Sequence, residues 1–258
     1  MHVACRCMLL NRFAHYDVDT KKKKKNHERQ SSSRIDRHCH LALHYSSLRR
    51  TECAAFAPIA VGGILVAIIF AGGPISGGHY NPVFSLALTL RGGMPVPEML
   101  SYWVAQFIGA IVGSLCGGIV GSSYATISIG ADATLAQALL AEAVITFMLC
   151  FVALCVATNP KVEFDSNHHY GLAIGLVIVA GAISIGGISG GSFNPVVALS
   201  LSITSGMSKF FYALLISAAN VVGGIVAVGC FRVVLPSAFN AGGTPKETVD
   251  ETTPLQVY

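Results

Sequence analysis

Five long apolar runs constrain the fold of this chain more than any other feature of its sequence. They cover residues 54–73, 99–121, 133–157, 171–185 and 210–231. Glu142 is the only charged residue in all five runs, and a helix needs about 20 mostly apolar residues to cross a bilayer. Between residues 54 and 235 there are only four basic and five acidic residues, far fewer than a soluble domain carries. We therefore expect an all-α membrane protein with five full spans, and we exclude a soluble enzyme and a nucleic-acid-binding protein.

Two shorter apolar segments resemble each other. Residues 81–90 and 194–203 have ten residues each, or roughly 15 Å as helix, which is half of a ~30 Å hydrocarbon core. Each segment begins within the frame Ser-Gly-Gly-x-aromatic-Asn-Pro-Val, which starts at Ser76 and again, 113 residues later, at Ser189. Three apolar runs lie between the two frames, so the second frame enters from the opposite face of the membrane. This layout indicates an inverted repeat whose half-helices meet at the midplane.

The tips of the two half-helices carry the chemistry that the sequence predicts. The pore motif consists of Asn81, Pro82, Val83, Asn194, Pro195 and Val196. Asn is a good helix N-cap and Pro suits the first helical position, so each amide N–H is left to face the midplane. Two positive helix ends there disfavour a cation, whereas a neutral molecule with a lone pair can accept a hydrogen bond. The motif predicts passive passage of water and small uncharged solutes, with no catalytic residue, cofactor or metal.

Other classes of function fit the sequence less well. Four cysteines and three histidines near the N-terminus match no standard zinc-site spacing; they are Cys5, Cys7, Cys39, Cys53, His38, His40 and His44. A membrane protease built on Ser189 would need a base on a neighbouring span, and a secondary transporter would need a coupling-ion site, for which the spans carry no Asp or Lys. A non-conducting homologue with a structural or regulatory role stays open as the alternative function.

Residues 54–235 resemble the major intrinsic protein family, the aquaporins and aquaglyceroporins. The family's Asn-Pro-Ala boxes stand here as Asn-Pro-Val, residues 141–147 resemble the start of the family's second half, and residues 102–106 resemble its third span. The resemblance implies an aquaporin-like bundle in a lipid bilayer, with five full spans and two half-helices, that forms a homotetramer with one pore in each subunit. It also implies a set of residues that support the pore loops: Glu142, His79, Gly77, Gly78, Gly190 and Gly191.

Family spacing places four selectivity-filter positions on Val61, Ala182, Gly191 and Val197. Water-selective members have an aromatic residue, a His and an Arg at three of these positions, and Val197 stands where the Arg is usual. All four residues here are small or apolar. The resemblance therefore predicts a wide, apolar filter that passes glycerol, urea, ammonia or peroxide at least as well as water.

Residues 1–53 depart from the family pattern. They hold 12 of the 17 Lys and Arg residues where the family has its first span. Five crossings would place this basic segment outside, against the tendency of Lys and Arg to remain in the cytoplasm. We hypothesise a disordered or incorrect start at residues 1–53, a channel domain at 54–235 and a polar tail at 236–258.

Overall fold

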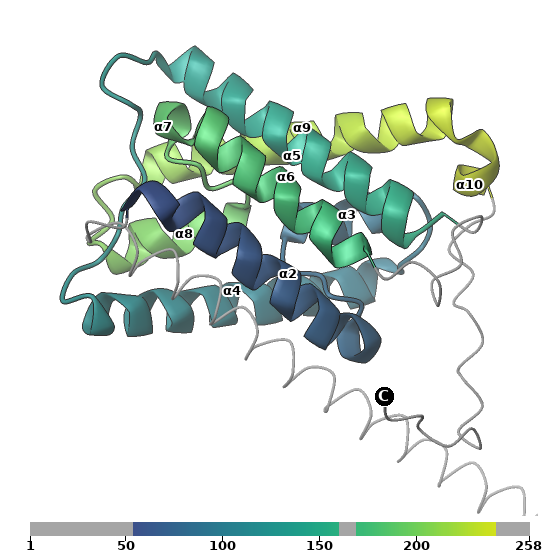
Figure 1. Ribbon diagram of the computed structural model, residues 1–258, viewed down its shortest axis with the longest axis horizontal. Helices are drawn as coiled ribbons and strands as arrows, with labels where there is room; N and C mark the ends of the chain where they lie inside the picture. The colour runs from purple at the N-terminus through teal and green to yellow at the C-terminus, as the bar shows by residue number, and fades with distance from the viewer. Residues whose placement is uncertain (1–53, 160–168, 241–258) are drawn as a thin grey trace, which may run out of the picture.

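The computed structural model describes residues 54–159 and 169–240, and all regular structure within these two ranges is helical. The expected all-α class is therefore confirmed. The hypotheses about residues 1–53 and most of the C-terminal tail lie outside the described residues. The helices (Figure 1) are η1 (Ala54–Phe56), α2 (Ala57–Ser76), α3 (Pro82–Leu90), α4 (Val96–Val120), α5 (Leu135–Ala157), α6 (Tyr170–Ser184), α7 (Gly186–Ser189), α8 (Pro195–Thr204), α9 (Phe210–Val234) and α10 (Pro236–Asn240).

Four helices, α2, α4, α5 and α9, are long and apolar enough to cross a membrane. The fifth predicted span is α6, which has 15 residues and is therefore about 22 Å long. It ends at Ile185, after which the chain continues directly into the single turn of α7. The two predicted half-helices are α3, with nine residues, and α8, with ten.

Local sequence determines where the helices begin and end. At the start of α5, Thr134 and Gln137 form a capping box: each backbone N–H donates to the other residue's side-chain oxygen. α2 ends where Gly77 adopts a φ of 69°, and α7 ends where Gly190 adopts a φ of 96°. Glycine enters this left-handed region without steric cost. A glycine in the left-handed conformation therefore ends each of the two helices that precede a half-helix.

α2 and α6 cross closely through a pair of glycines. A Cβ atom on Gly62 would lie 2.8 Å from the carbonyl oxygen of Gly175, and a Cβ atom on Gly175 would lie 2.8 Å from that of Gly62. Val179 packs against Gly62 as Val66 packs against Gly175. Gly62 and Gly175 are 113 residues apart in the sequence, and so are Val66 and Val179, which is the separation of the two Ser-Gly-Gly-x-aromatic-Asn-Pro-Val frames. Reciprocal contacts of this kind are what an inverted repeat predicts, and small residues permit the close approach.

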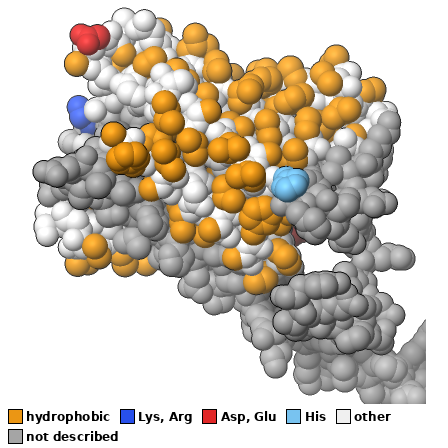
Figure 2. Space-filling view, in the orientation of Figure 1, with side chains coloured by type: hydrophobic (Ala, Val, Ile, Leu, Met, Phe, Trp, Pro, Cys, Tyr) orange, Lys and Arg blue, Asp and Glu red, His pale blue; other side chains and the backbone are white. Residues whose placement is uncertain are grey.

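The half-helices lie inside the bundle, and apolar side chains cover its outside. α3 packs against α4 and α9, α8 packs against the same two helices, and α5 packs along α9. Figure 2 shows one face covered mainly by hydrophobic side chains, with charged ones only near its edge. Exposed apolar residues such as Val104, Ile119, Leu176 and Phe211 are suited to contact with lipid.

Candidate functional site

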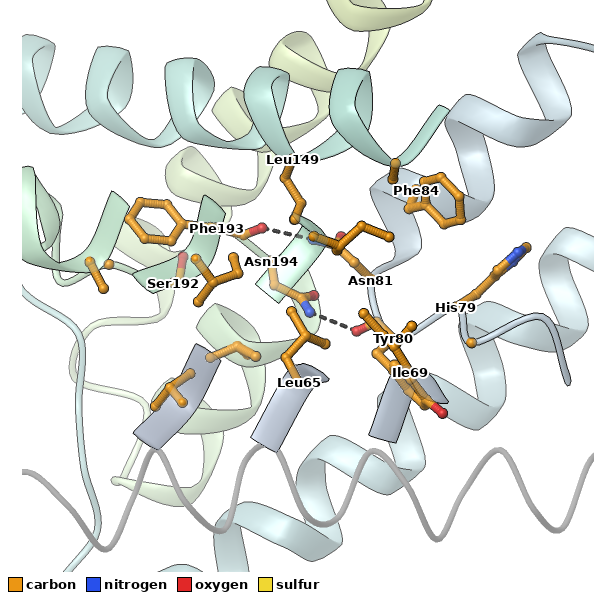
Figure 3. A pocket seen from close by; sticks show the side chains of 18 of the residues that line it. Leu65, Ile69, His79, Tyr80, Asn81, Phe84, Leu149, Ser192, Phe193 and Asn194 are labelled. Carbon is orange, nitrogen blue, oxygen red and sulfur yellow. Dashed lines mark hydrogen bonds between the residues drawn. The ribbon is translucent and has the colours of Figure 1, made fainter. Parts of the chain in front are cut away.

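The tips of α3 and α8 meet through two reciprocal hydrogen bonds (Figure 3). The Asn81 Nδ2 donates to the carbonyl oxygen of Phe193 at 2.8 Å, and the Asn194 Nδ2 donates to the carbonyl oxygen of Tyr80 at 2.8 Å. Each side-chain amide has two N–H groups, so these bonds use one of the two. Sequence reasoning anticipated amides at this place, but it missed that each amide also ties its half of the molecule to the other half.

The same two asparagines cap their own helices. The Asn81 Oδ1 accepts the Val83 N–H at 3.0 Å, and the Asn194 Oδ1 accepts the Val196 N–H at 3.2 Å. The proline after each asparagine occupies the first helical turn. The oxygen of each amide is therefore directed to its own helix, and the nitrogen to the opposite loop.

A buried carboxylate on α5 holds the second pore loop, which is formed by residues 190–194 between α7 and α8. Glu142 is fully buried and accepts five hydrogen bonds. Two come from the N–H groups of Ser192 (2.9 Å) and Phe193 (2.6 Å). The Ser189 and Ser192 hydroxyls donate at 2.7 and 3.0 Å, and the Asn220 amide donates at 2.8 Å. Phe193 has a φ of 49°, a costly value for a residue with a side chain, and the bond from its N–H to Glu142 holds it there.

A side-chain amide also contacts the first pore loop, which is formed by residues 77–81 between α2 and α3. The Gln106 Nε2 donates to the carbonyl oxygen of His79 at 3.0 Å and to Ser85 Oγ at 3.2 Å. The buried His79 ring lies 4.8 Å from the Tyr102 ring, centroid to centroid. Gln106 and Asn220 are each the eleventh residue of their helices, α4 and α9. Sequence reasoning assigned neither amide to the site, although each is the only Asn or Gln in its apolar run.

A cavity of about 480 Å³ passes both tips. Along α2, every fourth residue from Ala57 to Gly77 lines the cavity. Along α6, every fourth residue from Tyr170 to Ala182 does so. The residues of these two stripes are Ala57, Val61, Leu65, Ile69, Gly73, Gly77, Tyr170, Ile174, Ile178 and Ala182. At 1.5 Å per residue the α2 stripe is about 30 Å long, which equals the thickness of a hydrocarbon core.

The structure brings the four filter candidates to this cavity, since Val61, Ala182, Gly191 and Val197 all line it. Val61 is near the start of α2 and Ala182 is near the end of α6. The two helices run antiparallel, because Gly73 lies beside Tyr170 at the opposite end. Val61 and Ala182 therefore share one end of the cavity. No Lys, Arg, Asp or Glu is among the lining residues in the described part of the chain.

The structure describes one of the two rival sites that the sequence suggests. Within residues 54–159 and 169–240, no three His, Cys, Asp or Glu side chains are grouped so that they could hold a metal ion, and the N-terminal Cys and His residues lie outside the described ranges. The hydroxyl of Ser189 donates to Glu142 and its carbonyl oxygen accepts the Tyr212 hydroxyl at 2.7 Å. Ser189 is thus part of the network that holds the second loop.

Comparison with known proteins decides the family. The family model for major intrinsic proteins matches residues 35–183 and, in an overlapping second match, residues 130–256. The chain belongs to the major intrinsic protein family. This is a family of integral membrane channels and not of enzymes, and membership in it confirms the expected family and the multi-pass membrane location.

Similar proteins come from distant organisms. A probable TIP-type aquaporin of Antirrhinum majus is 31% identical over 195 residues, covering 72% of this chain and 76% of that protein. The probable aquaporin AqpM of Archaeoglobus fulgidus is 40% identical over 138 residues, covering 51% of this chain and 55% of the relative. The probable aquaporin TIP2-2 of rice (Oryza sativa subsp. japonica) is 32% identical over 148 residues. The chain spans little more than half of the archaeal and rice relatives, 55% and 57% of their lengths.

A solved structure supports the fold. The aquaglyceroporin from Plasmodium falciparum superposes with a TM-score of 0.70, covering 81% of this chain and 98% of that chain. The sequence identity is 21%, so this similarity bears on the fold alone.

Proposed function

We propose that this protein is a passive channel for water and for small uncharged solutes of the size of glycerol, urea, ammonia and hydrogen peroxide. The reciprocal bonds of Asn81 and Asn194 carry the proposal. They set two half-helix tips against each other beside a cavity whose lining follows the whole length of α2. Such a cavity is long enough to join the two sides of a bilayer.

The tips favour neutral molecules over cations. Each half-helix directs the positive end of its dipole at the meeting point, and each asparagine keeps one N–H beyond the bond that it makes to the opposite loop. A neutral solute can accept hydrogen bonds from these N–H groups. A cation would have to shed its hydration shell beside like charge in a medium of low dielectric constant.

We also propose that Val61, Ala182, Gly191 and Val197 form the selectivity filter. They all line the cavity, and none of their side chains carries a hydrogen-bonding group. A filter of this kind is wide and apolar, so it passes small solutes at least as well as water.

The loop-support role that we propose for Glu142 follows from its contacts with Ser189, Ser192 and Phe193. His79 and four glycines belong to the same support. The glycines Gly77, Gly78, Gly190 and Gly191 have φ values between 65° and 96°, which other residues adopt only with strain.

Stopped-flow measurements on proteoliposomes test the proposal, with water, glycerol, urea and ammonia as separate permeants. A channel gives flux above that of empty liposomes, linear with the gradient and without saturation. The Asn81→Leu variant keeps the shape of the side chain but loses the bond to Phe193, and we expect it to lose most of the flux. Accumulation against a gradient would indicate a transporter, and folded protein without flux would favour the non-conducting alternative.

The assembly and extent of the channel are proposals as well. Following the family resemblance, we propose a homotetramer in which each subunit has its own pore, and a channel domain at residues 54–235. Native mass spectrometry of the detergent-solubilised protein tests the assembly, and a monomer would contradict it.

A further inference from the structure

We infer that one end of the cavity accepts hydrogen bonds and that the described residues place no side chain there that is free to donate them, so that the channel prefers solutes with N–H or O–H groups over acceptor-only solutes of the same size. This inference rests on the proposed channel function and names the substrate class of the same pore. We call the end at which Val61 and Ala182 lie the filter end. Gly191 packs against Gly186, which lies beside Ala182, and Ser192 follows Gly191 in the chain; Val197 lines the same cavity.

The peptide geometry of the second loop determines where its carbonyl groups point. The N–H groups of Ser192 and Phe193 both donate to Glu142, at 2.9 and 2.6 Å. No cis peptide bond occurs in the described ranges, and in a trans peptide the N–H and the preceding C=O point in opposite directions. The carbonyl groups of Gly191 and Ser192 therefore point away from Glu142.

The loop lies between the carboxylate and the cavity. Gly191, Ser192 and Phe193 line the cavity, whereas Glu142 is fully buried and does not line it. Carbonyl groups directed away from Glu142 are thus directed at the lumen. Two successive acceptors face a solute at the filter end.

The side chains at the filter end add no free donor. Val61, Ala182 and Val197 carry no polar atom, and Gly191 has no side chain. The Ser192 hydroxyl is the one side-chain donor in the set, and it donates to Glu142 at 3.0 Å. A solute meets side-chain donors only farther along, at the amides of Asn81 and Asn194.

This arrangement distinguishes solutes by their hydrogen-bonding groups. A solute in an apolar passage displaces the water that would otherwise donate hydrogen bonds to the exposed carbonyl groups. A solute with N–H or O–H groups replaces those bonds, whereas an acceptor-only solute leaves the carbonyl groups unpaired. An unpaired, desolvated polar group costs enough to slow passage by roughly tenfold. Ammonia, small amides, peroxides and polyols carry donors, whereas sulfoxides carry only acceptors.

Acetamide and dimethyl sulfoxide test the inference, because they are of similar size and only acetamide carries N–H groups. Fluxes into proteoliposomes that contain the full chain are measured by stopped flow and corrected for empty liposomes, with water flux measured in the same preparations. We expect acetamide to enter roughly tenfold faster than dimethyl sulfoxide.

A matched pair of variants separates hydrogen bonding from size. Val61→Asn and Val61→Leu introduce side chains of nearly the same shape, but only Asn adds N–H donors. We expect the ratio of acetamide flux to dimethyl sulfoxide flux to fall severalfold in V61N relative to V61L.

The outcomes distinguish the inference from the proposed function. Water flux together with equal acetamide and dimethyl sulfoxide fluxes overturns the inference and leaves the channel function intact. Equal flux ratios in V61N and V61L also overturn it. Absence of water flux in folded wild-type protein refutes the channel function and the inference together.

Discussion

The Glu142→Gln variant tests how strongly the buried carboxylate holds the second pore loop. The substitution preserves the shape of the side chain but leaves one oxygen where there were two. Oε2 of Glu142 accepts three of the five bonds, so the remaining oxygen of the glutamine is best placed at that site. The new NH₂ group then takes the place of Oε1 and faces two donors, the Ser192 N–H and the Ser189 hydroxyl. A hydrogen bond to a charged group contributes about 1.5–3 kcal/mol.

Two lost bonds of this kind cost at least about 3 kcal/mol. We expect E142Q to destabilise the protein by this lower limit, because the Ser189 hydroxyl can rotate and accept a bond from the new NH₂ group. For a chain of this size, that loss lowers the midpoint of thermal unfolding by about 6–12 °C. The fluorescence of Trp103, the only tryptophan of the chain, reports unfolding in detergent micelles. Its Nε1 donates to the carbonyl oxygen of Pro82 at 3.0 Å, next to the first pore motif.

Glu98→Gln is the matched control for this experiment. Glu98 lies in the first turn of α4 and is half-buried, and its charge there is worth only about 0.3–1 kcal/mol. Equal unfolding midpoints for E142Q and E98Q would refute the idea that the Glu142 network stabilises the loop.

Three further substitutions test the filter and the α2–α6 crossing. Val197→Arg should reduce glycerol flux more than water flux in proteoliposomes, and an equal loss of both would count against a wide filter. Gly62→Ala places a Cβ atom 2.8 Å from a carbonyl oxygen and should cost about 1–3 kcal/mol in thermal unfolding; Gly63→Ala, with nothing within 4 Å, should cost little, and equal losses would contradict the close crossing. Ala182→Cys should make water flux sensitive to a bulky thiol reagent, whereas Ala182→Ser should not, and an unblocked A182C would place residue 182 away from the pore.

The meeting of the half-helices was predictable because its signals are local. An N-cap asparagine followed by proline determines where α3 and α8 begin, and two copies of the motif imply two tips. The family resemblance singled out Glu142 for the loops, but its partner Asn220 depends on how α5 packs along α9, which no local pattern encodes.

The packing of the long helices was not predictable in the same way. Gly62 and Gly63 are neighbours in one apolar run, yet only Gly62 contacts the opposite helix. In a membrane a small residue can face lipid or another helix, and hydropathy does not distinguish the two. The extent of α6, by contrast, was predicted to within one residue at each end: the expected run covers residues 171–185, and the helix covers Tyr170–Ser184.

The reciprocal amide bonds between the halves also bear on biosynthesis. Asn81 leaves the ribosome 112 residues ahead of its acceptor, Phe193, and Tyr80 precedes its donor, Asn194, by 114 residues. The first half-helix must therefore wait, with its polar tip incompletely paired, until α4, α5 and α6 and the loop up to Asn194 have been translated. A nascent chain cut short within that interval would expose the tip to lipid, whereas separately expressed halves could rescue each other once both reach the same membrane.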